Sequence, residues 1–94
     1  MDEKDLEKLA IDMEEYLVPK NLRKNLYLYF SKHILPGRFL TACLENNLEE
    51  ALSYASERSW DYIYNTVSFL YNAAPCTAWG SIKKVAEWCS KRNL

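Results

Sequence analysis

The residues best suited to chemistry lie between Tyr16 and Arg38, a segment rich in cations and aromatic rings. Residues 16–40 contain five bases and no acid. The bases are Lys20, Arg23, Lys24, Lys32 and Arg38, and the rings include Tyr16, Tyr27, Tyr29 and Phe30. Lysine and arginine donate charge-assisted hydrogen bonds to phosphate, and aromatic rings stack on nucleobases. The segment therefore suits a nucleotide or a nucleic acid.

Two other interpretations of this basic segment remain open. Its cations can be a solvated helix face, as most charge runs are. They can also pack against an acidic face of a neighbouring molecule, such as the one carrying Glu3, Glu7, Asp12 and Glu14. Residues 1–15 hold seven acids and two bases, and the whole chain has a net charge of −1. Because a duplex DNA-binding domain is expected to be strongly positive, the partner predicted here is a small anion that needs only a local patch.

Catalytic chemistry has little support in the sequence. The single histidine, His33, has no metal-binding partner at helical spacing, and no serine or cysteine is arranged with it. Cys43 and Cys89 lie on apolar faces and are interpreted as core residues. Adjacent acids such as Glu14 and Glu15 project apart on a helix. We therefore expect no enzyme, no metal site and no cofactor.

Two glycine turns could hold an anion. Gly37, in the run Pro36-Gly37-Arg38, and Gly80, in Trp79-Gly80-Ser81, each precede a predicted helix. The free backbone N–H groups at a helix N-terminus attract anions. The alternative is ordinary helix capping.

Apolar residues at helical spacing predict an all-α fold of five or six helices packed antiparallel in a compact bundle. The first helix spans 3–17, and Pro19 either kinks it or starts a new helix. A second helix carries Leu22, Leu26, Phe30 and Ile34, and a short third spans 39–44. The apolar stripe of the first helix is Leu6, Leu9, Ala10, Met13 and Leu17.

The second half of the chain predicts three more helices. Asn47 caps one whose inward residues are Leu48, Ala51, Leu52 and Ala55. Ser59 is the expected cap of the next, and Ser81 the cap of the last. The helix after Ser59 carries a stripe of Trp60, Ile63, Tyr64, Val67, Leu70, Tyr71 and Ala74. The last helix carries Ile82, Val85, Ala86 and Cys89, with Lys91 and Arg92 favourably placed at its C-terminal end.

The chain as a whole, residues 1–94, fits one small domain that would gain stability by oligomerisation. Three unpaired cysteines and an acidic N-terminus without an apolar signal core predict a reducing, cytoplasmic location. The uncharged stretch 62–82 contains Asn65, Asn72 and Pro75 and is periodic, so we expect a core helix and a turn, with no membrane span.

A resemblance to a known family is carried mainly by the residues after Pro36. These are the runs Pro36-Gly37-x-Phe39-Leu40-Thr41-Ala42-x-Leu44-Glu45-Asn46-Asn47-Leu48-x-x-Ala51, Val67-Ser68-Phe69-Leu70-Tyr71-Asn72-x-Ala74-Pro75 and Trp79-Gly80-Ser81, followed by Trp88. They resemble the phage anti-CBASS cyclic-nucleotide sponge family. Before Pro36 the chain is similar to that family only in layout, with a long N-terminal helix broken by a proline.

The resemblance implies a homohexamer that captures cyclic di- and trinucleotide second messengers and withholds them from a bacterial antiviral effector without cleaving them. It also implies a base-stacking tyrosine, for which Tyr16 is the nearest match, and a phosphate-binding basic residue, either Lys32 or His33. The family's basic residue associated with trinucleotides is replaced here by Ala73 and Ala74, which puts that pocket in doubt, although Arg38 could substitute. The expected ligand-binding residues are Tyr16, Lys20, Arg23, Lys24, Lys32, His33, Gly37 and Arg38.

Two functions from other classes remain as alternatives. One is a protein-interaction module, an inhibitor or adaptor that docks through its aromatic and charged faces. The other is a small DNA-binding regulator with a helix-turn-helix around Asn47 or Ser59. Against the latter, the predicted helix from Ser59 to Ala74 has no cation to face phosphates.

Overall fold

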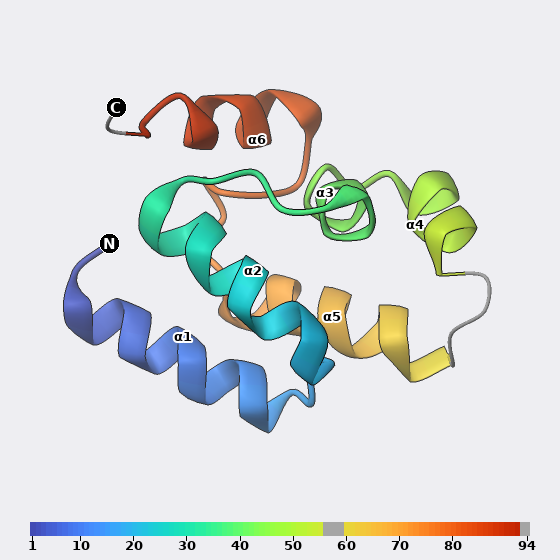
Figure 1. Cartoon of the computed structure of the whole chain (residues 1–94), viewed down its shortest axis with the longest axis horizontal. Helices are drawn as coiled ribbons and strands as arrows, with labels where there is room; N and C mark the ends of the chain where they lie inside the picture. The colour runs from blue at the N-terminus through green and yellow to red at the C-terminus, as the bar shows by residue number, and fades with distance from the viewer. Residues whose placement is uncertain (56–59, 93–94) are drawn as a thin grey trace.

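The first two helices are of equal length and are joined by a short link (Figure 1). The computed structural model describes residues 1–55 and 60–92. Helix α1, Glu3–Glu15, begins at Asp2, whose carboxylate accepts a hydrogen bond from the backbone N–H of Asp5. Helix α2, Lys20–Lys32, begins directly after Pro19, which is its N-cap residue. The chain therefore starts a new helix after the proline, which is one of the two alternatives the sequence left open.

The end of α1 corrects the sequence prediction for Leu17. This residue adopts a left-handed conformation with φ +59°, and its side chain is 66% exposed. The backbone N–H groups of Leu17 and Val18 bond back to the carbonyls of Glu14 and Met13, which is the Schellman arrangement that ends a helix. The helix ends two residues earlier than predicted, so Leu17 leaves the apolar stripe. Ala10 is also exposed, whereas Leu9 and Met13 are buried as expected.

Two short helices follow α2. Helix α3, Arg38–Leu44, ends in a second Schellman arrangement at Asn46, and helix α4, Leu48–Tyr54, begins after Asn47. The predicted cap at Asn47 is confirmed, because its side chain accepts a hydrogen bond from the backbone N–H of Glu50. The prediction that Leu48 and Leu52 point inward is wrong: both are more than half exposed. Only the small residues Ala51 and Ala55 are buried on this side.

Helix α5, Trp60–Ala73, is the longest, and its predicted inward face is only partly confirmed: Leu70 is buried, and Val67 and Ala74 pack against the core. Its buried residues are Thr66, Phe69 and Leu70, whereas Tyr64 and Tyr71 are 66% and 78% exposed. Most residues of the predicted stripe lie one position C-terminal to the residues that face the core, and one position corresponds to a rotation of about 100° around the helix. The cap expected at Ser59 and the side chain of Trp60 lie outside the described residues.

Helix α6, Ile82–Cys89, closes the fold across the ends of α2 and α3 (Figure 1). Ser81 caps it as predicted, by accepting a hydrogen bond from the backbone N–H of Lys84. Val85 and Trp88 are buried, but the predicted inward residue Ile82 is 66% exposed, and Ala86 is exposed as well.

The six helices among the described residues surround one hydrophobic core, and no strand occurs in that part of the chain. The largest fully buried side chains include Tyr29, Phe30 and Phe69, whose rings pack edge to face in pairs. The radius of gyration is 12.3 Å, close to the value of about 12 Å expected for a compact domain of this length. Over residues 1–55 and 60–92, no helix is long and apolar enough to cross a membrane.

Candidate functional site

The C-terminal ends of α2 and α6 meet and exchange hydrogen bonds. The indole Nε1–H of Trp88 donates to the backbone carbonyl of Tyr29 at 2.8 Å, and Nδ1 of His33 lies 2.9 Å from the backbone carbonyl oxygen of Trp88. Both carbonyls also accept a backbone N–H bond at the end of their own helix, from His33 and Lys91 respectively. Each helix end thus supplies a side chain that bonds to a carbonyl of the other, and these two bonds join the two ends.

A cationic pocket opens where these ends meet. We use this name for the cavity lined by Ser31, Lys32, His33, Ile34, Lys91 and Arg92. Its volume is about 550 Å³, which is within the range of pockets that bind small molecules. Two of its cations follow α6 and one ends α2, so residues about 60 positions apart in the sequence share one wall.

The electrostatics of the cationic pocket favour an anion. Lys32, Lys91 and Arg92 contribute three positive charges, and no carboxylate from the described part of the chain lines the pocket. The two helix C-termini oppose them with about −0.5 charge each, which leaves a net charge of about +2. The cations therefore exceed what is needed to neutralise the helix ends.

The ring of Trp88 supports two of the pocket's side chains. The imidazole of His33 packs against it with ring centroids 4.5 Å apart, and Nζ of Lys91 lies 5.0 Å from the indole centroid. A lysine ammonium at this distance from an indole is stabilised by a cation–π interaction. Trp88 is itself buried, so it gives these two side chains a fixed surface to pack on.

The titratable groups behind Trp88 are held neutral. Burial raises the pKa of the Tyr29 hydroxyl well above its usual range, with smaller contributions from Cys89 and Glu45. Burial also raises the pKa of the Cys89 thiol. Near neutral pH neither group adds charge to the site.

The structure separates the predicted ligand-binding cations of α2 and its C-cap into two groups within one copy of the chain. Lys32 and His33 lie at the C-terminal end of α2 and line the cationic pocket, whereas Lys20, Arg23 and Lys24 lie in its first turns. The twelve-residue separation from Lys20 to Lys32 spans about 18 Å along a helix. Nε of Arg23 also donates to the carbonyl oxygen of Val18 at 2.7 Å.

The predicted aromatic residues are separated in the same way. Tyr16 ends α1 and is half-buried against the core, next to the group of cations at the start of α2. The expectation that Tyr29 and Phe30 offer stacking faces is wrong, because both rings are fully buried in the core. Tyr27 is 38% exposed and keeps a face accessible to solvent.

Gly37 and Arg38 lie at the start of α3, away from the cationic pocket lining. Gly37 is the N-cap residue and is exposed, and α3 has only seven residues. Arg38 lines a separate cavity of about 210 Å³ with Leu35, Pro36, Thr41, Glu50 and Tyr54.

Lys91 and Arg92 are the site residues that sequence reasoning missed. The sequence explains them as cations that favourably end a helix. Nothing local indicates that this end meets the end of α2, because the junction depends on long-range bonds made by Trp88. The tryptophan itself was the available signal, since a buried indole N–H needs an acceptor.

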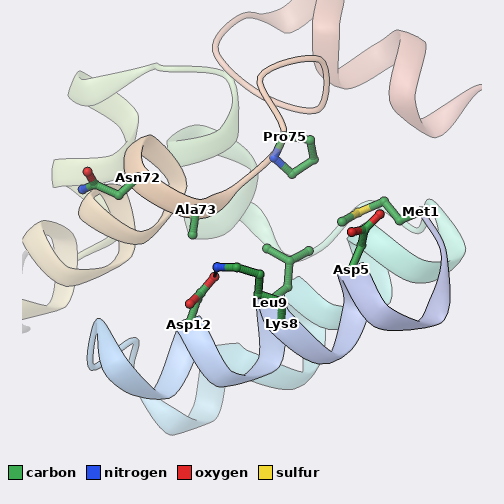
Figure 2. Close-up of a pocket in the computed structure, with 8 residues that line it drawn as sticks. All are labelled: Met1, Asp5, Lys8, Leu9, Asp12, Asn72, Ala73 and Pro75. Atoms are coloured by element: carbon green, nitrogen blue, oxygen red, sulfur yellow. Dashed lines mark hydrogen bonds and ion pairs between the residues drawn. The ribbon is translucent and has the colours of Figure 1, made fainter.

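A further cavity lies between α1 and the end of α5 (Figure 2). Its volume is about 350 Å³, and its charged side chains are Asp5, Lys8 and Asp12. Nζ of Lys8 lies 3.1 Å from the Asp12 carboxylate, so the one cationic side chain is already paired. Ala73 lines this cavity too. Its charged side chains are two acids and one paired lysine, so the lining offers no unpaired cationic side chain to a phosphate.

Comparison with protein-family models, curated proteins and solved structures gives no match for this chain.

Proposed function

We propose that this protein binds cyclic oligonucleotide second messengers and sequesters them without cleaving them. The observation that carries the proposal is the cationic pocket, in which three permanent cations and His33 surround a cavity of about 550 Å³. A cyclic dinucleotide carries two phosphodiester charges, which matches the net charge of about +2 left after the helix ends are counted. Charge-assisted hydrogen bonds from Lys32, Lys91 and Arg92 would hold these phosphates.

Sequestration is favoured over hydrolysis by the chemistry of the pocket lining. Its described side chains are cations, a histidine, a hydroxyl and an aliphatic residue, without a carboxylate to work beside the histidine. General acid–base cleavage normally pairs groups with matched proton affinities. This lining is better suited to holding a phosphodiester than to activating an attacking group.

The resemblance to the anti-CBASS sponge family supports the same ligand class. Its strongest segment, 36–51, forms α3 and the start of α4, and its late tryptophan is Trp88, which packs against the pocket residues His33 and Lys91. Dinucleotides are favoured over trinucleotides, because Ala73 and Ala74 replace the family's basic residue and the cavity that Ala73 lines has its single lysine paired with Asp12.

Self-association is part of the proposal. Within one copy, Tyr16, Lys20, Arg23 and Lys24 lie at the opposite end of α2 from the cationic pocket. We propose that an antiparallel six-helix protomer, bent at the link before Pro19, assembles into a homohexamer. In it the start of α2 from one copy would complete the pocket of another. In an isologous pair this exchange would be reciprocal, so the pair would hold two equivalent pockets.

Exposed apolar side chains support this assembly. Tyr64 and Tyr71 lie two turns apart on α5 and are mostly exposed, and Leu48 and Leu52 project together from α4. Large apolar side chains grouped on a surface are typical of protein interfaces. The same residues are the observation that favours the second candidate function, a protein-interaction module that docks another protein through α5.

The setting proposed for this activity is the cytoplasm of a host bacterium, with the chain encoded by a phage. There the captured nucleotide would be withheld from an antiviral effector. Duplex DNA is not proposed as a partner, because α5 carries Asp61 as its single charged residue.

A ligand panel followed by heating tests the function. The protein is incubated with cyclic di- and trinucleotides, separated from unbound ligand and heated, and the released ligand is identified by chromatography. We expect at least one cyclic dinucleotide to co-elute with the protein and to return intact. Degraded ligand would indicate an enzyme, and no retained ligand across the panel would reject the proposal.

Sedimentation velocity at micromolar concentration tests the assembly. A hexamer is expected, and Tyr64→Asp with Tyr71→Asp should dissociate it if α5 forms the interface. A monomer in the wild type would contradict the shared pocket. The interaction module would be favoured by a different result, in which neither protein binds a nucleotide, and another protein binds the wild type but not the tyrosine variant.

A further inference from the structure

The two ring nitrogens of His33 have different roles, which the geometry fixes. Nδ1 lies 2.9 Å from the carbonyl oxygen of Trp88, at the end of α6. A backbone carbonyl oxygen can only accept a hydrogen bond, so Nδ1 must carry the proton. The neutral ring is then the Nδ1–H tautomer, and its Nε2 atom carries a lone pair.

Nε2 is the atom that remains for a ligand. His33 lines the cationic pocket, and Nε2 has no hydrogen-bond partner in the described part of the chain. A phosphodiester offers only acceptor oxygens, and a lone pair on Nε2 cannot donate to them. The ring can therefore contact a phosphate productively only when Nε2 is protonated as well, which is the imidazolium.

We infer that His33 binds the anion only as an imidazolium, so that occupation of the cationic pocket takes up one proton. The inference deepens the proposed function and rests on it for the identity of the anion. The proton comes from solvent and is held on Nε2, between the ring and a phosphate oxygen. Nδ1–H keeps its bond to Trp88 throughout, so the ring does not turn when it charges.

The groups that face His33 allow the proton taken up on binding to be assigned to this residue. The cations around it are Lys32 from its own helix and Lys91 and Arg92 after α6. Tyr29 and Cys89, behind Trp88, have raised pKa values and stay neutral between pH 5.5 and 8. Histidine is the side chain that titrates in this interval, and His33 is the only one in the chain.

The backbone at His33 decides which variant is informative. Its φ is +59°, in the left-handed region that asparagine tolerates better than most residues. His33→Asn thus removes the titrating group while preserving the turn that ends α2. A matched control is Lys83→Ala, on the exposed surface of α6 and outside the pocket lining.

Nitrogen-detected NMR of the single histidine tests the geometry without any nucleotide. The free protein should show the Nδ1–H tautomer above the titration range, whereas histidine in water favours Nε2–H. Adding sulfate, whose charge is constant between pH 5.5 and 8, should move the midpoint of the His33 titration to higher pH. A neutral Nε2–H tautomer, or a midpoint that sulfate leaves unchanged, would overturn the inference.

Binding of cyclic di-GMP, cyclic di-AMP and cyclic GMP–AMP is then measured at several pH values. For a ligand that binds, the dissociation constant should rise by up to about tenfold for each pH unit above the histidine range, the limit set by one proton. His33→Asn should flatten this dependence, and Lys83→Ala should retain it. A flat wild-type profile overturns the inference while the proposed function stands. A sulfate-dependent midpoint without nucleotide binding supports the inference for anions and rejects the proposed function.

Discussion

Replacing Trp88 with phenylalanine should destabilise the whole domain, because Trp88 joins α2 to α6. The substitution removes the indole donor at 2.8 Å from the Tyr29 carbonyl, a net loss of about 1 kcal/mol. The Tyr29 carbonyl still accepts from the backbone N–H of His33, which limits that cost. The smaller ring also leaves a void at a buried position, which adds about 2 kcal/mol.

The expected total, about 3 kcal/mol, is a large part of the stability of a domain this small. It corresponds to a melting temperature lower by roughly 15 °C, which circular dichroism measures directly. Trp79→Phe is the matched control, because Trp79 is half-buried beside the core and its indole makes no hydrogen bond within residues 1–55 and 60–92. Urea denaturation should rank the two variants in the same order. A Trp88→Phe protein within about 0.5 kcal/mol of the wild type would refute the claim that this junction holds the two helix ends.

Three further predictions concern the thiols and the link between α1 and α2. Burial raises the pKa of Cys43 from 9.0 to about 12, so its contribution to stability is complete below pH 9 and is lost as the pH rises towards 12. The free energy of unfolding measured in urea should fall over that interval, and Cys43→Ala should make the fall shallower. Cys76 is exposed and should react with Ellman's reagent at pH 8 in the folded protein, whereas Cys43 should react only after unfolding; rapid labelling of both would contradict the burial of Cys43. Leu17→Gly should raise the melting temperature by a few degrees. The left-handed conformation costs a leucine about 1 kcal/mol and a glycine almost nothing, and the Leu17 side chain is mostly exposed, so little packing is lost.

Most helix positions follow from local sequence signals. Asn47 and Ser81 cap helices where predicted, and Pro19 separates the first two. These features act over three or four residues, so a single chain is enough to reveal them. The length of α1 was overestimated because no glycine indicates the left-handed residue that ends it.

The faces that point inward were harder to predict than the helices. Apolar residues occur almost all around α5, so Tyr64 and Tyr71 fit the helical spacing as well as Phe69 does. Which of two overlapping stripes is buried depends on the neighbours, α1 and α3, and not on α5 alone. The same reason explains the exposure of Leu48 on a helix of only seven residues.

Only the α2 side of the cationic pocket could be predicted from the sequence. The resemblance led to the expectation that either Lys32 or His33, just before the Pro36-Gly37 turn, binds phosphate, and both residues line the cationic pocket. The sequence could not supply Lys91 and Arg92, whose place in the pocket depends on the bond between the Trp88 indole and α2. Long-range contacts of this kind have no periodic signature.

Calorimetric titration of the tightest cyclic dinucleotide against paired variants tests the central claim most directly. Lys91→Ala with Arg92→Ala removes two cations from the pocket, and Lys4→Ala with Lys83→Ala removes two exposed cations elsewhere, so net charge is matched. We predict that the first pair weakens binding by about tenfold for each cation lost and that the second pair changes it by less than about twofold. Equal effects of the two pairs, or undiminished binding without Lys91 and Arg92, would contradict the assignment of this pocket as the ligand site.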